Sequence, residues 1–249
     1  MGSALLAGWL KAGVPAASVW VIEPNPSDWL RTTGVHLNAG VPPSPAVALL
    51  AVKPQMMGAA LPALQALGNG ETVFVSIAAG TTIAAFEATL GDRTPIVRTM
   101  PNTPAMVNRG ITALCRNRHV SDADMALAVA LMSAVGQTVI LAGEHQIAAV
   151  TAVSGSGPAY VFHLIEALAT AGEAEGLSPE VSLQLARATV CGAGELAHQS
   201  PDSAAQVRIN VTSPGGTPAA ALAVLMPELP DLMRRAVKAA ADRGRELGK

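Results

Sequence analysis

The sequence predicts an α/β domain with a doubly wound sheet, followed by an all-α domain. Short apolar runs alternate with helical segments up to about residue 143. These runs are continuously apolar, as is typical of a parallel sheet covered on both faces. Strand signals cease after residue 143, and segments rich in Ala, Leu, Val and Gly follow. We therefore expect one domain over residues 1–143 and a second, helical domain over residues 144–249.

Six segments have the composition of buried strands. They are Val19–Ile22, Val47–Val52, Thr72–Ile77, Pro95–Arg98, Ile111–Leu114 and Thr138–Leu141. Helices are predicted between them. One covers Thr81–Leu90, where Gly91 provides a stop. The other covers Asp122–Val135, with Ser121 as its N-cap and Gly136 at its end. The alternation of strand and helix indicates the doubly wound α/β class.

The chain opens on a segment with helical character, Met1–Leu10, and not on a strand. A dinucleotide-binding unit has the order strand, glycine-rich turn, helix, and Gly2 stands where the last glycine of G-x-G-x-x-G belongs. Glu23 ends the next strand, 21 residues after Gly2. This is the place of the acid that binds the ribose 2′-OH, although a solvated carboxylate at a strand end has the same pattern. The pattern predicts a Rossmann-like domain whose first strand and first two glycines are missing.

The missing strand has physical consequences. In this fold the first strand is central, so its loss leaves both neighbouring strands with an unpaired edge. The turn after it carries the amides that cradle a pyrophosphate. We expect the natural chain to begin roughly 10–15 residues earlier, as one strand and its turn require. We also expect the present sequence to bind a dinucleotide poorly.

Three loops follow strands at the edge of the sheet where ligands bind in this fold. Their candidate coenzyme residues are Val52, Lys53, Pro54, Ala78, Ala79 and Asn102. Lys53 is placed to meet a coenzyme phosphate, or it is a solvated loop lysine. Asn102 lies in a proline-stiffened loop that holds its amide in place, or it bonds its own backbone in a turn.

The helical half contains several capped segments. A long helix is expected over His145–Thr170, with a bend near residues 155–158, and a second begins after the cap Ser178 and runs through Ala197. A short helix follows Pro201. Thr217 caps a helix whose first residue is Pro218, and a last, separate helix covers Pro227–Leu247.

These helices have little polar face, so they are buried on most sides. We therefore expect an obligate homodimer with interlocked helices; the alternative is a monomeric bundle.

Composition excludes several classes of protein. Only 14% of the residues are charged, the net charge is −2, and no Lys/Arg cluster indicates a nucleic-acid partner. Gly, Pro or charge breaks each apolar stretch before the roughly 20 residues of a membrane span. There is no signal-peptide pattern, which indicates a cytoplasmic protein. Cys115 and Cys191 lack metal-ligand spacing, so no metal site is expected, and the five histidines form no motif.

Two runs of small residues and glycines lie about fifty residues apart, Val150–Tyr160 and Ile209–Thr217. Such runs let a backbone approach a ligand closely. Together with Val52–Pro54, Ser76–Gly80 and Met100–Pro104, in this order and spacing, they resemble the signature of the pyrroline-5-carboxylate reductase family.

The resemblance implies a Rossmann domain, a helical dimerisation domain, and reduction of 1-pyrroline-5-carboxylate to proline by hydride transfer from NADPH or NADH. This is the last step of proline biosynthesis. The resemblance also implies that homodimers assemble into rings.

The same resemblance implies a set of substrate residues. Glu144 and Asn210 should lie near the substrate, although Glu144 also suits the acidic first turn of a helix. The turn containing Ser213, Gly215, Gly216 and Thr217 offers amide donors to the substrate carboxylate. Family members usually carry Thr where this chain has Pro218, whose ring offers neither hydroxyl nor N–H. We therefore assign the catalytic role to Thr217; otherwise a water takes it, or turnover is impaired.

The choice of coenzyme stays open at this point. Glu23 repels a 2′-phosphate and slightly favours NADH, whereas the family often uses NADPH. One rival interpretation is a β-hydroxy-acid dehydrogenase. Such enzymes rely on a lysine in the helical domain, and no lysine occurs between Lys53 and Lys238. A second rival is a non-catalytic or impaired dinucleotide-binding homologue, which the missing glycines and Pro218 favour.

Overall fold

The computed structural model describes residues 1–248, and they divide into two compact units. The first comprises Met1–Gly155 together with the end of the chain from Ala241, and the second comprises Ser156–Ala240. Strands end before residue 144, as expected, but the first unit continues beyond that point. The reason is packing, because Ile147 is buried in the core beneath the sheet.

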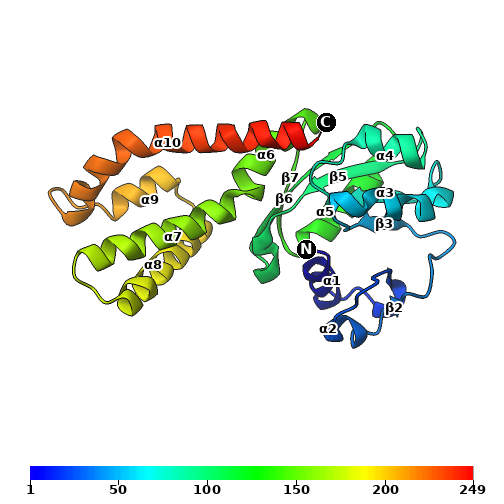
Figure 1. Cartoon of the computed structure of the whole chain (residues 1–249), viewed down its shortest axis with the longest axis horizontal. Coiled ribbons are helices and arrows are strands. Elements are labelled where there is room, and N and C mark those ends of the chain that lie inside the picture. The colour runs from blue at the N-terminus through cyan, green and yellow to red at the C-terminus, as the bar shows by residue number, and fades with distance from the viewer. Residues whose placement is uncertain (249) are drawn as a thin grey trace. The chain divides into compact units, whose positions relative to one another are not determined.

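The first unit is built on two sheets (Figure 1). The larger has the strand order β3-β4-β5-β6-β7 and the smaller has the order β1-β2. The strands are β1 (Trp20–Val21), β2 (His36–Leu37), β3 (Val47–Leu50), β4 (Val73–Ser76), β5 (Ile96–Met100), β6 (Gly110–Arg116) and β7 (Gly136–Ile140). All six predicted strands are present, and β2 is an additional strand that the sequence pattern did not indicate.

The larger sheet is mixed, which corrects the expectation of a purely parallel one. β3, β4 and β5 are parallel, whereas β6 pairs antiparallel with β5, and β7 is parallel to β6. The cause is the short connection over residues 101–109. A parallel return needs a crossover of roughly a dozen residues or more, so this strand has to come back antiparallel.

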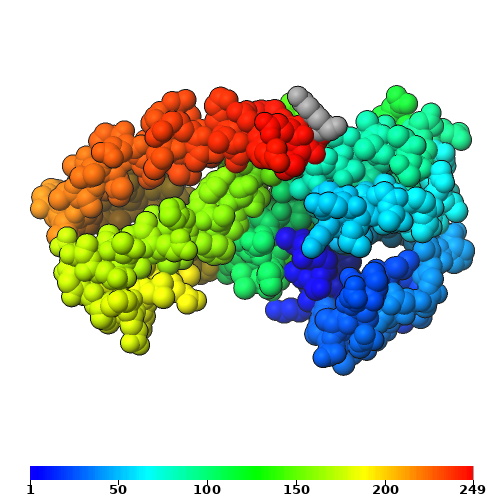
Figure 2. Space-filling model, in the orientation of Figure 1, coloured from blue at the N-terminus to red at the C-terminus, as the bar shows by residue number. Residues whose placement is uncertain are grey.

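Within residues 1–248, β1 and β3 are both edge strands. β1 pairs only with β2, and β3 pairs only with β4 among the described residues. In the Rossmann strand order 3-2-1-4-5-6, β2 and β1 correspond to places 3 and 2, and β3, β4 and β5 correspond to places 4, 5 and 6. Within residues 1–248 no strand fills place 1, at the centre. The expectation that the neighbours of the first strand are unpaired is therefore confirmed. Figure 2 shows an opening between the medium-blue segment that holds α2 (Asp28–Arg31) and β2 and the blue-cyan segment that holds α3 (Met57–Ala60).

Helices cover both faces of the larger sheet, and each face has its own core. Val73 and Val75 of β4 pack with α1 (Gly2–Lys11) and α5 (Asp122–Ser133). Phe74 points to the opposite face and packs with α3 and α4 (Ile83–Leu90). Short 3₁₀ turns complete the unit: η1 (Ala16–Ser18), η2 (Pro54–Met56), η3 (Leu61–Leu67), η4 (Thr103–Val107) and η5 (Glu144–Gln146).

The predicted caps of α5 are partly confirmed. The Ser121 side chain accepts the Asp124 N–H, and the Asp124 carboxylate accepts the Ser121 N–H, which completes a capping box. Gly136, however, does not end the helix; α5 ends at Ser133, and Gly136 opens β7 with φ +152°. A Cβ at Gly136 would lie 2.0 Å from the Gly110 carbonyl oxygen, so the close approach of β6 requires a glycine there.

The helical elements after β7 begin with a run from Glu144 to Ala174. This run contains α6 (Ile147–Val150), a π-helical segment (Thr151–Gly155) and α7 (Gly157–Ala174), so the expected bend coincides with a π turn. By length and composition alone, this run is long and apolar enough to cross a membrane, and 11% of its most apolar window is buried. One such helix is weak evidence for a membrane span, because core helices of other proteins pass the same test. Gly155, Gly157 and Pro158 interrupt its apolar sequence without ending the helical run, so the expected absence of a membrane partner stays a prediction.

The remaining helices are α8 (Pro179–Gln199), α9 (Ala204–Asn210) and α10 (Thr217–Leu247). α10 is one helix of 31 residues, so the prediction of two separate helices was wrong. That prediction took Pro227 as a break, but Pro227 and Pro230 both lie inside α10. Each proline removes one helix hydrogen bond without ending the helix.

Candidate coenzyme and substrate sites

The parallel pairing of β3, β4 and β5 brings the three predicted coenzyme loops to one edge of the sheet. Their carboxyl ends lead into the segments that contain Val52, Lys53 and Pro54, then Ala78 and Ala79, then Asn102. Lys53 and Pro54 are exposed at this edge, as is Ala79, whereas Ala78 is buried in the core. This edge is where ligands bind in open α/β sheets.

Gly2 begins α1 and lies against the loop after β3. A Cβ built on Gly2 would come within 3.2 Å of the Ala51 Cβ, which is tighter than ordinary contact. Close helix–strand packing is the role of the third glycine in the dinucleotide fingerprint. The structure therefore supplies a physical reason for glycine at this position.

Glu23 follows β1 and is partly exposed. Its carboxylate Oε1 accepts the N–H of Asn25 at 2.9 Å. Two prolines flank Asn25 and stiffen the loop that carries the carboxylate. The geometry suits a carboxylate held in place for a ligand, and the ribose contact stays a prediction.

Asn102 is 9% exposed, and the protein itself satisfies its side-chain amide. Oδ1 accepts the Ile111 N–H at 2.9 Å, and Nδ2 donates to the carbonyl of Ser154 at 3.2 Å. Neither alternative from the sequence anticipated these partners. The side chain ties the loop after β5 to β6 and to the π segment, so a coenzyme contact by Asn102 stays a prediction.

Glu144 belongs to a cluster that the sequence did not indicate. Its Oε1 accepts the N–H of Ile83, the first residue of α4, at 2.8 Å. The same oxygen accepts a hydrogen bond from Nη1 of Arg98 at 2.5 Å. Arg98 is only 6% exposed, so this carboxylate neutralises a buried guanidinium and satisfies a helix N-terminus.

A cavity of about 310 Å³ adjoins this cluster. Its lining includes Gly80, Thr82, Arg98, Glu144 and Thr151. The cavity thus lies beside the loop after β4 that was assigned to the coenzyme. The sequence analysis did not single out Arg98, because one arginine in an apolar strand produces no periodic pattern. The one signal that could have indicated a buried ion pair was a charged residue within the otherwise uncharged β5.

Cys115 lies opposite Arg98 in the β5–β6 register and is 1% exposed. Burial raises the pKa of its thiol from 9.0 to about 11, and the nearby Glu144 carboxylate adds to the rise while Arg98 opposes it. The thiol is therefore neutral at physiological pH.

A tight turn precedes α10. The Gly216 N–H donates to the Ser213 carbonyl at 3.0 Å, with Pro214 and Gly215 between them and φ +69° at Gly215. Pro then Gly with positive φ is the pattern of a type II turn. The Gly216 carbonyl accepts the N–H of Ala220 at 3.3 Å.

This geometry corrects the predicted cap. Gly216 holds the capping position, Thr217 is the first helical residue, and Pro218 is the second. Pro218 has no N–H, so the N–H of Thr217 is the donor left at the start of α10. A helix N-terminus of this kind attracts a carboxylate.

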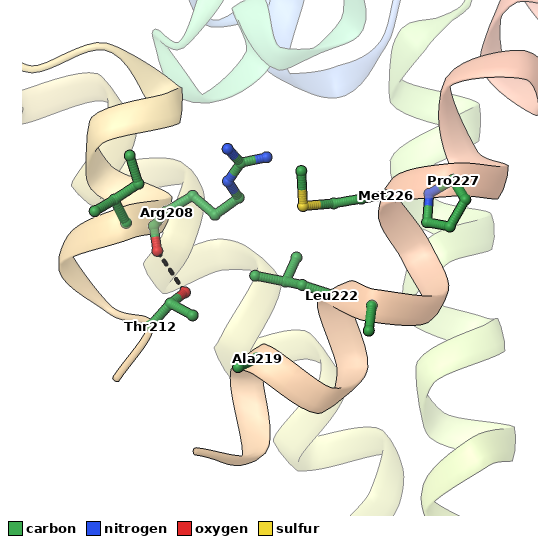
Figure 3. Close-up of a pocket in the computed structure, with 8 residues that line it drawn as sticks. Arg208, Thr212, Ala219, Leu222, Met226 and Pro227 are labelled. Atoms are coloured by element: carbon green, nitrogen blue, oxygen red, sulfur yellow. Dashed lines mark hydrogen bonds between the residues drawn. The ribbon is translucent and has the colours of Figure 1, made fainter. Parts of the chain in front are cut away.

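Asn210 ends α9, and its amide is engaged within the same unit. Oδ1 accepts from Gln206 Nε2 at 2.8 Å, and Nδ2 lies 3.4 Å from Asp202 Oδ2. Beside it, α9 and α10 enclose a hollow of about 370 Å³. In Figure 3 the side chains of Arg208 and Met226 extend into this hollow, and the Thr212 hydroxyl donates to the Arg208 carbonyl.

Among residues 1–248 no group of three or more His, Cys, Asp or Glu is placed to hold a metal ion. The candidate residues are distributed over both units. Gly2, Glu23, the three loops and Glu144 belong to the first unit. Asn210 and the 213–217 turn belong to the second unit.

Comparison with known proteins supplies the family. Residues 144–247 match the family model for pyrroline-5-carboxylate reductase dimerisation. The chain is 41% identical over 254 residues to the pyrroline-5-carboxylate reductase of Pseudomonas aeruginosa, covering 99% of the chain and 93% of that relative. The chain belongs to the pyrroline-5-carboxylate reductase family. The resemblance found in the sequence motifs is thereby confirmed.

Further relatives and solved structures agree with this family. The pyrroline-5-carboxylate reductase of Mycobacterium tuberculosis is 40% identical over 253 residues, covering 89% of the chain and 84% of the relative. The reductase structure from Coxiella burnetii has a TM-score of 0.93 at 35% identity and covers 100% of this chain and 95% of its own. A Plasmodium falciparum pyrroline carboxylate reductase with NADP bound has a TM-score of 0.83 at 29% identity, with coverage of 100% and 95%.

The Glu144 cluster leads to a first prediction. We expect Glu144→Ala to lower the free energy of unfolding by about 2–4 kcal/mol, because Arg98 loses its counter-ion and the Ile83 N–H loses its acceptor. Urea unfolding of the purified chain measures this. The control is Glu166→Ala, whose ion pair with His163 is exposed and should change stability by less than about 0.5 kcal/mol. Equal unfolding midpoints for both variants would contradict the structural role.

Cys115 leads to a second prediction. In a Cys191→Ser background we expect iodoacetamide to leave Cys115 unmodified at about pH 8 unless urea is present, because the buried thiol is not ionised. Since its pKa is about 11 when folded and 9.0 when exposed, the unfolded chain releases the proton first. Its contribution to stability is therefore complete below pH 9 and is lost as the pH rises towards 11. Mass spectrometry measures the modification. Rapid labelling of the folded chain would contradict a buried, un-ionised Cys115 thiol.

Proposed function

We propose that this chain reduces 1-pyrroline-5-carboxylate to L-proline with hydride from NADPH or NADH, the last step of proline biosynthesis. The observation that carries the proposal is the likeness to reductases of this family over essentially the whole chain. The sheet edge that suits a dinucleotide and the amide-rich turn before α10 are the features that such a reaction uses.

The coenzyme residues that we propose are Gly2, Glu23, Val52, Lys53, Pro54, Ala78, Ala79 and Asn102. The close contact of Gly2 with Ala51 and the held carboxylate of Glu23 fit a dinucleotide. Glu23 would accept hydrogen bonds from the adenosine ribose, and Lys53 would face the phosphates. The coenzyme, when bound, supplies the hydride.

The substrate residues that we propose are Glu144, Asn210, Ser213, Gly215, Gly216 and Thr217. The N–H of Thr217 and the neighbouring turn amides would hold the substrate carboxylate, assisted by the dipole of α10. The Thr217 hydroxyl would hold the ring nitrogen, which keeps its proton while the hydride adds to the C=N carbon. Reaction requires the hydride donor and the C=N carbon of the substrate to be held in contact.

The helical segment supports a homodimer, as its match to a dimerisation model implies. Unit 2 buries only small side chains, Ala169, Ser182 and Ala186. Large apolar side chains stay exposed along its helices, among them Phe162, Leu164, Leu185, Val224 and Leu232. A patch of this kind marks a subunit interface.

We propose that residues 1–143 form the coenzyme domain and residues 144–249 the substrate and dimerisation domain. We also propose that the dimers assemble into rings, and that the protein acts in the cytoplasm without membrane or nucleic-acid partners. Purification without detergent followed by light scattering tests the assembly. A chain that needs detergent to stay in solution would contradict this part.

The assay that tests the function measures oxidation of NADH and of NADPH with and without pyrroline-5-carboxylate. Substrate-dependent oxidation is the expected result, and the two rates give the coenzyme preference. A folded dimer without turnover would support the alternative, an impaired or non-catalytic homologue. A variant extended at the N-terminus by one strand and a glycine-rich turn then separates these cases, because restored turnover identifies an enzyme limited by coenzyme binding.

Pro218 leads to a third prediction. We expect Pro218→Thr to raise kcat, because it adds a hydroxyl and an N–H at the second residue of α10. The matched control is Pro179→Thr, also in the first turn of a helix, which should leave kcat unchanged. Steady-state kinetics with pyrroline-5-carboxylate measure both. An unchanged or lower kcat for Pro218→Thr would count against a role of this position in catalysis.

A further inference from the structure

Asn38 holds the backbone of Glu23 from both sides. The Glu23 N–H donates to Asn38 Oδ1 at 2.9 Å, and Asn38 Nδ2 donates to the Glu23 carbonyl at 3.0 Å. One side-chain amide thus makes the paired bonds that a neighbouring strand would otherwise make. Because Asn38 follows β2 directly, it extends the β1–β2 ladder past its last strand pair, Val21 and Leu37.

The backbone of Asn38 is shaped for this task. Its N–H donates to the Val21 carbonyl at 2.8 Å, and its φ is +54°. Asparagine tolerates this left-handed conformation better than other side chains except glycine. The residue therefore turns the chain out of β2 and points its amide back to Glu23.

Little else fixes Glu23. β1 has two residues and, within residues 1–248, pairs only with β2, so the ladder offers few hydrogen bonds. At its other end the Trp20 ring stacks on His36, with centroids 4.3 Å apart, which sets the register. At the end that bears Glu23, the two Asn38 bonds provide the corresponding constraint.

Because the Glu23 backbone is fixed, the range of positions open to its carboxylate is also restricted. Pro24 has no N–H, so the Asn25 N–H is the nearest donor in the chain after Glu23, and it binds Oε1. Within residues 1–248 the second oxygen, Oε2, has no hydrogen-bond partner. A fixed carboxylate with one uncommitted oxygen can accept from a ribose 2′-OH and repels a 2′-phosphate in the same place.

We propose that Asn38 is a positioning residue that sets coenzyme choice by holding Glu23. This inference rests on the proposed NAD(P)H-dependent function and on the ribose role of Glu23. Without the Asn38 side chain the Glu23 carboxylate moves more freely, so it discriminates less against the 2′-phosphate of NADPH.

The test compares Asn38→Gly, Glu23→Gln and the double variant with the parent chain. Glycine keeps the left-handed backbone of Asn38 without strain, so only the clamp is lost. We expect Asn38→Gly to lower the NADH-to-NADPH ratio of kcat/KM by about three- to tenfold, as the loss of two modest hydrogen bonds implies. The change should appear in the KM of the coenzyme and not in kcat. In the Glu23→Gln background, Asn38→Gly should leave the ratio unchanged.

The matched control is Asn69→Gly. Asn69 has φ +56°, and its Oδ1 accepts a backbone N–H from Arg93 at 2.9 Å, before β4 and β5 at the opposite edge of the sheet. It should leave the ratio unchanged even if it lowers stability. An unchanged ratio in Asn38→Gly, or an equal shift when Glu23 is already Gln, would overturn the proposal.

Fluorescence titrations with NADH and with NADPH separate this proposal from the proposed function. They use the parent chain, Asn38→Gly, Glu23→Gln and the double variant. A binding ratio that shifts in Asn38→Gly without any turnover would support the positioning role while the reductase activity fails. Turnover by the parent chain with a constant ratio would refute the positioning role alone. Binding of neither coenzyme, by the parent chain or by the chain extended with one strand and a glycine-rich turn, would overturn both.

Discussion

The parallel register of β3, β4 and β5 decides where three of the proposed coenzyme loops lie. Because parallel strands all end at the same edge, one pairing pattern brings residues near 52, 78 and 102 together across fifty positions of sequence. The register in turn depends on the two cores, since Val73 and Val75 face one and Phe74 faces the other. A slip by one residue would exchange these faces and separate the loops.

Two polar contacts connect this edge to the segment that begins the helical half. Glu144 binds Arg98 and the start of α4, and Asn102 binds the Ser154 carbonyl in the π segment. Buried polar groups of this kind are costly unless satisfied, so each contact restricts the backbone around it. Together with the packing of Ile147 in the core, they hold residues 144–155 in the compact unit of the sheet. Glu144 consequently has a structural role beside the substrate role that the family resemblance implies.

The helical unit buries small side chains and leaves large apolar ones exposed. Gly172 and Ser182 let α7 and α8 approach closely, and only small side chains are buried between these helices. The large apolar side chains remain outside, where one chain cannot cover them. A second copy resolves this imbalance, in agreement with the dimerisation family that the segment matches. The same exposed apolar surface explains why one helical run passes for a membrane span by composition.

The sequence by itself determined the elements whose causes are local. Apolar runs located six of the strands, Ser121 and Ser178 located helix starts, and ordered short motifs located the family. Only the tertiary structure decided what depends on distant partners. The antiparallel return of β6 depends on sheet pairing. Hydrophobic periodicity also does not predict that α10 continues through Pro227. It does not predict the hydrogen bonds of Glu144, Asn102 and Asn38 either. The physical reason is that caps and apolar patterns act within a few residues, whereas a buried carboxylate or amide is satisfied by whatever backbone the completed fold brings to it.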